Sequence, residues 1–171
     1  MIFLTIGTHE PFDRLIRAVD DWCAAHGTGA QIFGQITDPK PGAYRPQYFD
    51  WVARLSPQEY NRRFTAAVLI VSHAGMGSIL TALHHATPIV VMPRRGHLRE
   101  TRNDHQFTTV RMLGSRPGIY VAEDETHLGT VIERALAAAQ APQADPISAF
   151  ADATFTDSLR AFLTGQPDDR K

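Results

Sequence analysis

Short runs of consecutive apolar residues recur along the chain, separated by longer segments in which apolar residues return every three or four positions. The runs span residues 2–6, 30–36, 68–71, 89–92 and 118–121. A strand that is apolar at nearly every position is buried on both faces, as in a parallel sheet between two layers of helices. The pattern therefore predicts an α/β protein whose parallel sheet is covered by helices on both faces.

The intervening segments carry helical signals. Apolar side chains spaced i, i+3, i+4 and i+7 predict a helix that opens at Pro11 and ends at Gly27. The residues of this apolar face are Phe12, Leu15, Ile16, Val19 and Trp22. Ser56 and Pro57, with Glu59 after them, are a typical helix start, and that helix is expected to reach about residue 66. Further helices are expected at 77–85, 103–113 and 124–139, and a short strand within 48–55.

The last thirty or so residues differ in character, so two regions are expected: a domain at 1–140 and a linker with a C-terminal helix at 141–171. Proline and alanine dominate 141–146, and a loosely helical apolar stripe follows. Its members are Ile147, Phe150, Phe155, Leu159, Phe162 and Leu163. This stripe either packs on the domain or docks another chain.

Composition narrows the class of protein. The 171 residues, 43% hydrophobic and 20% charged, suffice for one sizeable core. A net charge of −1 argues against non-specific nucleic-acid binding, which needs a basic face. Cys23 is the only cysteine, which excludes an intramolecular disulfide and a thiolate metal cluster. No apolar run approaches the roughly 20 residues that span a bilayer, so a cytoplasmic location is expected, with membrane attachment only through a partner.

The most informative segment is the turn after the strand at 68–71. Ser72 and His73 end the strand, and Gly75-Met76-Gly77-Ser78 opens a helix. Glycines let backbone amides approach a ligand closely, and the uncapped amides of a helix N-terminus attract phosphate. His73 adds a side-chain donor, although a histidine at a strand end often serves only turn geometry or packing.

Two other polar segments follow strands of the predicted sheet. Gly7-Thr8-His9 comes after the first strand, and the donor-rich, cationic stretch 94–106 comes after the strand at 89–92. Because parallel strands end at one edge, where α/β proteins bind ligands, all three segments are expected to form one site. The residue types favour a nucleotide diphosphate with an attached group.

The segments SHAGMGS, TPIVVMPRRG and RNDHQ resemble the C-terminal, donor-binding domain of GT-B glycosyltransferases of the family-28 type. The opening TIGTHEPFDRLI resembles small stand-alone versions of that domain, which are the soluble subunits of two-part glycosyltransferases. Eukaryotes use such a pair on dolichol-linked oligosaccharide, and bacteria use related pairs for exopolysaccharide and capsule. The resemblance covers roughly residues 1–135 and implies a Rossmann-like fold equivalent to the C-terminal half of a GT-B enzyme.

The resemblance also implies a function. The chain would be the UDP-sugar-binding subunit of a heteromeric inverting glycosyltransferase that transfers a hexose-type sugar to a lipid-linked acceptor. Activity would require a membrane-associated, acceptor-binding partner that recruits the chain to the inner face of the membrane. The alternative is a non-catalytic nucleotide-sugar-binding regulator or scaffold. An isolated chain could also form a homodimer through the surface meant for its partner.

Residue by residue, the resemblance assigns the diphosphate to His73 and the glycine turn, and the donor sugar to the His-Gln pair. The positions matched to donor binding are Gly7, Thr8, His73, Ala74, Gly75, Met76, Gly77, Ser78, Arg94, His105 and Gln106. Further residues near the donor would be Gln35, Thr81, Glu100, Asn103 and Asp104. The catalytic base is expected from the partner, with His9 a weaker candidate, and no metal or cofactor is expected.

One position departs from the family's pattern. The family commonly has a ribose-binding glutamate eight residues after the motif histidine, and this chain has Thr81 there. Ribose recognition would then be weaker, or supplied by another residue such as Glu100. Arg94 and Arg95 follow the strand after the glycine turn and could neutralise the departing UDP.

Overall fold

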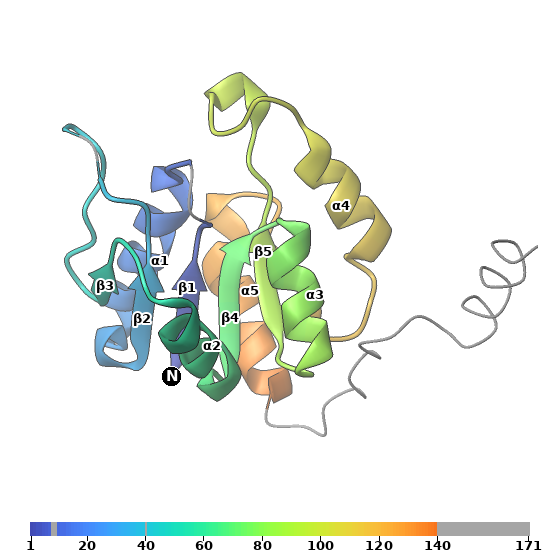
Figure 1. Cartoon of the computed structure of the whole chain (residues 1–171), viewed down its shortest axis with the longest axis horizontal. Coiled ribbons are helices and arrows are strands. Elements are labelled where there is room, and N and C mark those ends of the chain that lie inside the picture. Colours follow the sequence, from blue (N-terminus) through green and yellow to red (C-terminus); the bar gives the residue numbers. More distant parts are fainter. Residues whose placement is uncertain (8–9, 40, 140–171) are drawn as a thin grey trace, which may run out of the picture.

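The computed structural model describes residues 1–7, 10–39 and 41–139 (Figure 1). Its strands are β1 (Ile2–Thr5), β2 (Ile32–Gln35), β3 (Asp50–Val52), β4 (Leu69–His73), β5 (Ile89–Met92) and β6 (Ile119–Val121). Its α-helices are α1 (Asp13–His26), α2 (Pro57–Ala66), α3 (Met76–His84), α4 (His105–Leu113) and α5 (Glu125–Ala139). The expectations for Thr8, His9 and the region 141–171 lie outside the described residues.

The six strands form one sheet in the order β3-β2-β1-β4-β5-β6, and every pair is parallel. The predicted Rossmann-like α/β fold is confirmed. The strand order reverses direction between β1 and β4, where Thr5 pairs with Ser72. Connections on the two sides of such a switch point leave toward opposite faces of the sheet, which opens a crevice at the carboxyl ends of the strands. Gly7 and the glycine turn both flank this crevice.

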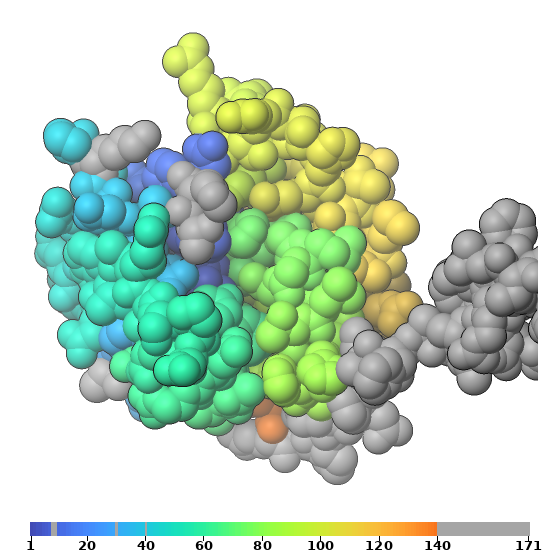
Figure 2. All heavy atoms as spheres, viewed as in Figure 1, coloured from blue at the N-terminus to red at the C-terminus, as the bar shows by residue number. Residues whose placement is uncertain are grey.

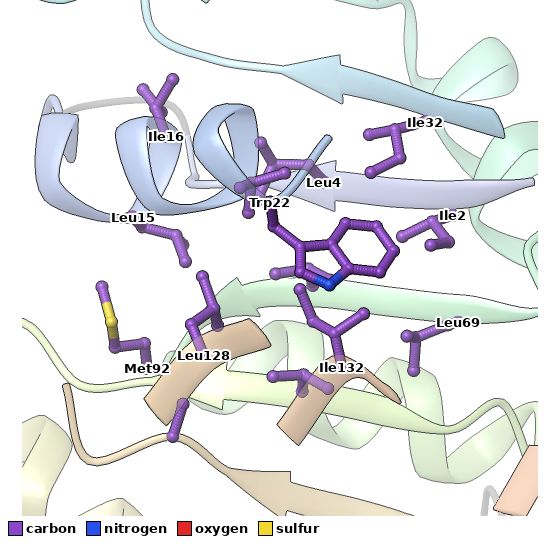
Figure 3. Close-up of a cluster of buried hydrophobic side chains, with 14 of the residues drawn as sticks. Ile2, Leu4, Leu15, Ile16, Trp22, Ile32, Leu69, Met92, Leu128 and Ile132 are labelled. Carbon is purple, nitrogen blue, oxygen red and sulfur yellow. The ribbon is translucent and has the colours of Figure 1, made fainter. Parts of the chain in front are cut away.

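Helices cover both faces of the sheet: α2 and α3 lie in front of it and α1 and α5 behind it in Figure 1. The side chains of β1 divide between the two layers, because successive residues of a strand point to opposite faces. Ile2 and Leu4 join a core with Trp22 and Ile132 (Figure 3), whereas Phe3 joins Phe64 on the other face. The continuous apolar runs are explained by this burial on both faces.

The segments that deviate from expectation do so at their ends. The second strand begins only at Ile32, because Gly29–Gln31 form a 3₁₀ turn (η1), and the loop after β5 contains another, η2 (Gly96–Leu98). The fourth strand continues two residues beyond the apolar run at 68–71 and ends at His73. Ser56 caps α2 as expected, since its hydroxyl accepts the Glu59 N–H at 3.2 Å.

A buried carboxylate on α1 fixes the long connection between β2 and β3. Asp20 is fully buried and accepts the Tyr44 hydroxyl at 2.7 Å, the Gln47 N–H at 2.9 Å and the Tyr48 N–H at 2.8 Å. A buried carboxylate is tolerated when its oxygens receive several donors. Burial and the Asp20 carboxylate raise the pKa of Tyr44 to about 12. The connection is therefore attached to the domain rather than free of it.

Candidate functional site at the carboxyl edge

The glycine turn joins the end of β4 to α3 with its amides left for a ligand. Ala74 is buried, and its N–H donates to the Met92 carbonyl of β5 at 3.2 Å, which seats the turn on the sheet. Gly75 is the N-cap of α3, and no side chain caps the helix there. The first-turn amides and the helix dipole thus create positive potential beside the switch point.

The His73 imidazole lies between two glycines. Gly7 has a φ of +82°, which favours glycine, and a Cβ there would lie 3.3 Å from the His73 Cε1. A Cβ at Gly75 would overlap the His73 Nε2. The Ser72 hydroxyl lies 3.3 Å from the His73 Nδ1. The loop after β1 and the residues on either side of His73 therefore hold the ring in one position.

The electrostatics of this position favour a neutral imidazole. Burial, with a smaller contribution from the positive charge of Arg94, lowers the pKa of His73 to about 4, while a hydrogen bond to the Thr5 backbone acts in the opposite direction. At neutral pH the ring is uncharged and can donate one N–H and accept at its other nitrogen. An anion arriving beside it would favour protonation.

A cavity of about 340 Å³ opens next to Gly7 on the α2 side of the crevice. Its other lining residues are Thr5, Gln35, Arg54, Leu55, Pro57, Tyr60 and Asn61. Gln35, expected near the donor, is buried, and its Oε1 accepts the Leu55 N–H at 3.0 Å. Sequence analysis missed the segment 54–61, although its position after β3 places it at the same edge. Figure 2 shows α2 beside α3 on this face.

Arg94 is placed differently from the expectation that it faces a departing diphosphate. Its side chain is buried, and its guanidinium donates to the backbone carbonyls of Ile6 (2.8 Å), Glu10 (2.7 Å), Glu100 (3.1 Å) and Pro11. The Phe12 ring lies 4.6 Å from the guanidinium carbon. Arg94 therefore supports the loops around the site and reaches a ligand only through its charge.

The predicted His-Gln pair begins α4, as expected from the sequence. The Gln106 Oε1 accepts the Arg94 N–H at 3.0 Å, so the amide nitrogen of Gln106 is the end that can donate to a ligand. His105 is exposed, and its backbone N–H donates to the Asn103 Oδ1 at 3.3 Å. The pair forms the start of the helix that follows the β5 loop, and therefore lies toward the same edge of the sheet as the glycine turn.

The other polar candidates are engaged in holding loops. Glu100 receives Arg14 at both carboxylate oxygens, each at 2.8 Å, and the Arg95 N–H at 2.8 Å. Asp104 accepts the Gly96 N–H at 2.9 Å. The Thr81 hydroxyl donates to the Gly77 carbonyl of its own helix at 2.8 Å. Thr81 has no carboxylate, and both carboxylate oxygens of Glu100 already accept hydrogen bonds, so neither residue supplies a free carboxylate for a ribose.

The part of the chain that the structure describes contains neither a metal-binding cluster nor a membrane-spanning helix. No group of three or more His, Cys, Asp and Glu residues there is arranged to hold a metal ion. None of the helices in the same residues is both long and apolar enough to cross a membrane.

The sequence matches a known family over most of its length. Residues 1–159 match the profile described as glycosyltransferase family 28 C-terminal domain. No curated protein matches the chain.

Solved structures share the fold at low sequence identity. The crystal structure of the glycotransferase of kitacinnamycin matches with a TM-score of 0.53 and 19% identity, covering 82% of this chain and 35% of that one. The NMR solution structure of ALG13 matches with a TM-score of 0.50 and 19% identity, covering 92% of this chain and 94% of that one. The chain thus spans about a third of the first protein and nearly all of the second.

Proposed function

The chain belongs to the family of glycosyltransferase family 28 C-terminal domains, and on that premise we propose that it is the donor-binding subunit of a heteromeric inverting glycosyltransferase. The donor is a UDP-sugar of the hexose type. The acceptor is a lipid-linked saccharide of exopolysaccharide, capsule or glycolipid assembly. The observation that carries the proposal is the meeting of Gly7, His73 and the uncapped start of α3 at the switch point of the sheet.

The diphosphate binds at the glycine turn. Backbone amides of Met76, Gly77 and Ser78 and the dipole of α3 provide donors and positive potential without a metal ion. His73 donates to a phosphate oxygen from the adjacent strand end. The resemblance also assigns Thr8 to donor binding, with His9 as the weaker candidate for a catalytic role.

The nucleoside extends from the diphosphate into the cavity between β1 and α2. The cavity adjoins Gly7 and combines apolar surface from Leu55 and Tyr60 with the polar side chains Gln35 and Asn61. A planar base with polar edges suits such a mixed lining. The donor sugar extends the other way, toward His105 and the amide nitrogen of Gln106.

The residues of this subunit act on the leaving group. When the bond between the sugar and UDP breaks, negative charge grows on the diphosphate, and amides already aimed at it stabilise the transition state. The acceptor hydroxyl must also lose a proton. We assign that base to the partner subunit, which binds the acceptor at the inner face of the membrane. No cofactor or metal takes part in the proposed reaction.

Exposed apolar side chains support a partner at this edge. Met76 and Leu80 lie one turn apart on α3 and are 44% and 45% exposed, and Leu98 in the loop after β5 is 47% exposed. Apolar residues close to a binding crevice are typical of surfaces that another domain covers. The region 141–171 is a second candidate for docking the partner, as its apolar stripe implies.

Calorimetric titration with UDP tests the donor site. The wild type is expected to bind, and His73→Ala to lose at least tenfold in affinity. His84→Ala is the matched control, since His84 is an exposed histidine in the last turn of α3, at the end opposite to the glycine turn. Equal affinity of all three proteins for UDP would contradict the proposal.

A non-catalytic nucleotide-sugar sensor is the second candidate, and Thr81 favours it. This residue stands where the family commonly has a ribose-binding glutamate, and its hydroxyl is bound within α3. Affinity purification from membranes of the native host separates the two functions. A catalytic subunit co-purifies with a membrane-associated, acceptor-binding glycosyltransferase subunit, and the complex transfers sugar. A sensor co-purifies with no such subunit, and the purified sample transfers no sugar.

A further inference from the structure

Arg94 is a buried cation whose hydrogen-bond partners are carbonyl groups. Arg94 is 3% exposed, and among the described residues each acceptor of its guanidinium is a backbone oxygen rather than a carboxylate. Burial lowers the pKa of Arg94 to about 10, while the nearby Glu100 and Glu10 act to raise it. Burying a charge costs free energy, so we ask what the buried guanidinium contributes to the site in return.

The four carbonyls belong to two loops that flank the crevice. Ile6, Glu10 and Pro11 are in the connection from β1 to α1, and Glu100 is in the connection from β5 to α4. A planar guanidinium with several fixed donors can hold separate carbonyls at once, whereas an ammonium cannot reproduce that geometry. One side chain thus joins two loops that are more than eighty residues apart in sequence.

The first loop determines the position of His73. The Ile6 carbonyl, at 2.8 Å from the Arg94 guanidinium, immediately precedes Gly7, where a Cβ would lie 3.3 Å from the His73 Cε1. The charge of Arg94 also acts on that ring, as the lowered pKa of His73 records. Among the described residues, Glu10 and Glu100 are the acidic groups recorded as acting on Arg94 itself.

The second loop determines the orientation of Gln106. The backbone N–H of Arg94 donates to the Gln106 Oε1 at 3.0 Å. This bond directs the amide nitrogen of Gln106 away from Arg94, which is the orientation a donor sugar would use. Backbone and side chain of one residue therefore act on both sides of the crevice.

We propose that Arg94 is a positioning residue of the donor site: it ties the loop after β1 to the loop after β5 and so holds His73 and Gln106 in place for the donor. The inference rests on the proposed function, since it concerns the same site. It replaces the direct contact with UDP that the sequence suggested for this arginine.

The test compares Arg94→Met and Arg94→Lys with two other arginines of the same region. Arg17→Met removes a guanidinium that stacks on Tyr44, 4.0 Å from the ring centre, away from the crevice. Arg14→Met removes a guanidinium that binds Glu100, Glu125 and the Pro93 carbonyl. Its contact with the loop that carries Gly7 is the Phe12 ring, 5.4 Å from the guanidinium carbon, and none of these hydrogen bonds goes to a carbonyl of that loop. Arg14→Met is therefore a control for loss of structural support.

NMR titration of the His73 ring gives a readout that simple destabilisation does not move. Arg94→Met is expected to raise the pKa of His73 from about 4, though not to its ordinary value, because burial remains. Arg94→Lys keeps the positive charge, so the pKa of His73 is expected to stay low. The same variant is expected to shift the NMR signals of the Gly7 amide and the Gln106 side chain. Both variants are expected to lose about tenfold in UDP affinity, a factor that corresponds to ~1.4 kcal/mol.

The outcomes are distinct. Arg17→Met and Arg14→Met are expected to leave the His73 titration unchanged. A folded Arg94→Met with unaltered His73 titration overturns the proposal, and if that variant does not fold, unmoved Gly7 and Gln106 signals in Arg94→Lys overturn it. If the wild type itself fails to bind UDP, the proposed function fails, while the His73 titration and the two NMR signals still test the positioning role.

Discussion

The imidazole of His73 fills the space that a Cβ atom on Gly75 would occupy. The backbone of Gly75 has φ −84° and ψ 134°, which any residue can adopt, so the requirement for glycine there comes from the ring and not from the backbone. The two residues are thus one unit, in which the turn is shaped to accommodate the histidine.

Gly75→Ala is therefore expected to displace the His73 ring and weaken UDP binding by at least tenfold while the domain stays folded. Gly77→Ala is the matched comparison for ring position, because a Cβ at Gly77 meets no other residue within 4 Å. The NMR signal of the His73 Cε1–H reports the displacement. If it moves no more in Gly75→Ala than in Gly77→Ala, the proposed steric link is wrong.

The pH dependence of stability should carry the signature of His73. Its pKa is about 4 in the folded chain against 6.5 for the ordinary group, so the unfolded state binds more protons between these values. Stability is then lost as pH falls from 6.5 toward 4, by an amount on the order of 2 kcal/mol.

His73→Gln removes this titration, so its free energy of unfolding should fall less steeply over the same range. Urea unfolding at pH 7, 6, 5 and 4.5 measures the difference between the two proteins. Parallel curves for wild type and variant would show that His73 titrates normally in the folded chain.

Asp20→Ala is expected to destabilise the domain by about 3 kcal/mol, because it removes a buried carboxylate and leaves its donors without an acceptor. Those donors, on Tyr44, Gln47 and Tyr48, hold the connection between β2 and β3. Asp21→Ala is the control, since the adjacent Asp21 is exposed, and it should change stability by less than about 0.5 kcal/mol. Chemical unfolding compares the two, and equal effects would contradict this assignment.

The cavity beside Gly7 can be tested separately from the glycine turn. Leu55→Trp is expected to fill part of the 340 Å³ cavity and to weaken UDP binding about tenfold. The binding of inorganic pyrophosphate should not weaken, because pyrophosphate lacks a nucleoside. Val68→Trp adds the same bulk at an exposed position where β4 begins, at the opposite edge of the sheet. Competition experiments with UDP and pyrophosphate measure the affinity of each variant for the two ligands. Equal loss for the two ligands would place the nucleoside elsewhere.

The sequence predicted the sheet well because β1, β4 and β5 are buried on both faces and so consist of continuous apolar runs. The glycine turn was predictable because glycines directly after an apolar run mark the end of a strand and leave backbone amides accessible to a ligand. Local patterns of this kind are visible in sequence because the interacting residues are neighbours.

The function of the charged residues was not predictable in the same way. Arg94 and Glu100 lie in a stretch whose composition indicates an anion site, but their partners are Ile6 and Arg14, which are 88 and 86 residues away. Only the folded chain brings these groups together. The cavity lined by 54–61 was missed for a similar reason, since its walls come from β1, β2 and α2.

The central claim is that UDP binds where β1 and β4 diverge at the carboxyl edge. Titration of the amide NMR spectrum of the full chain with UDP tests it most directly. The account predicts the largest shift changes at the amides of Gly7, Gly75, Met76, Gly77 and Ser78. Shifts confined to the opposite edge, around Val68, or no shifts at millimolar UDP with a folded chain, would contradict it.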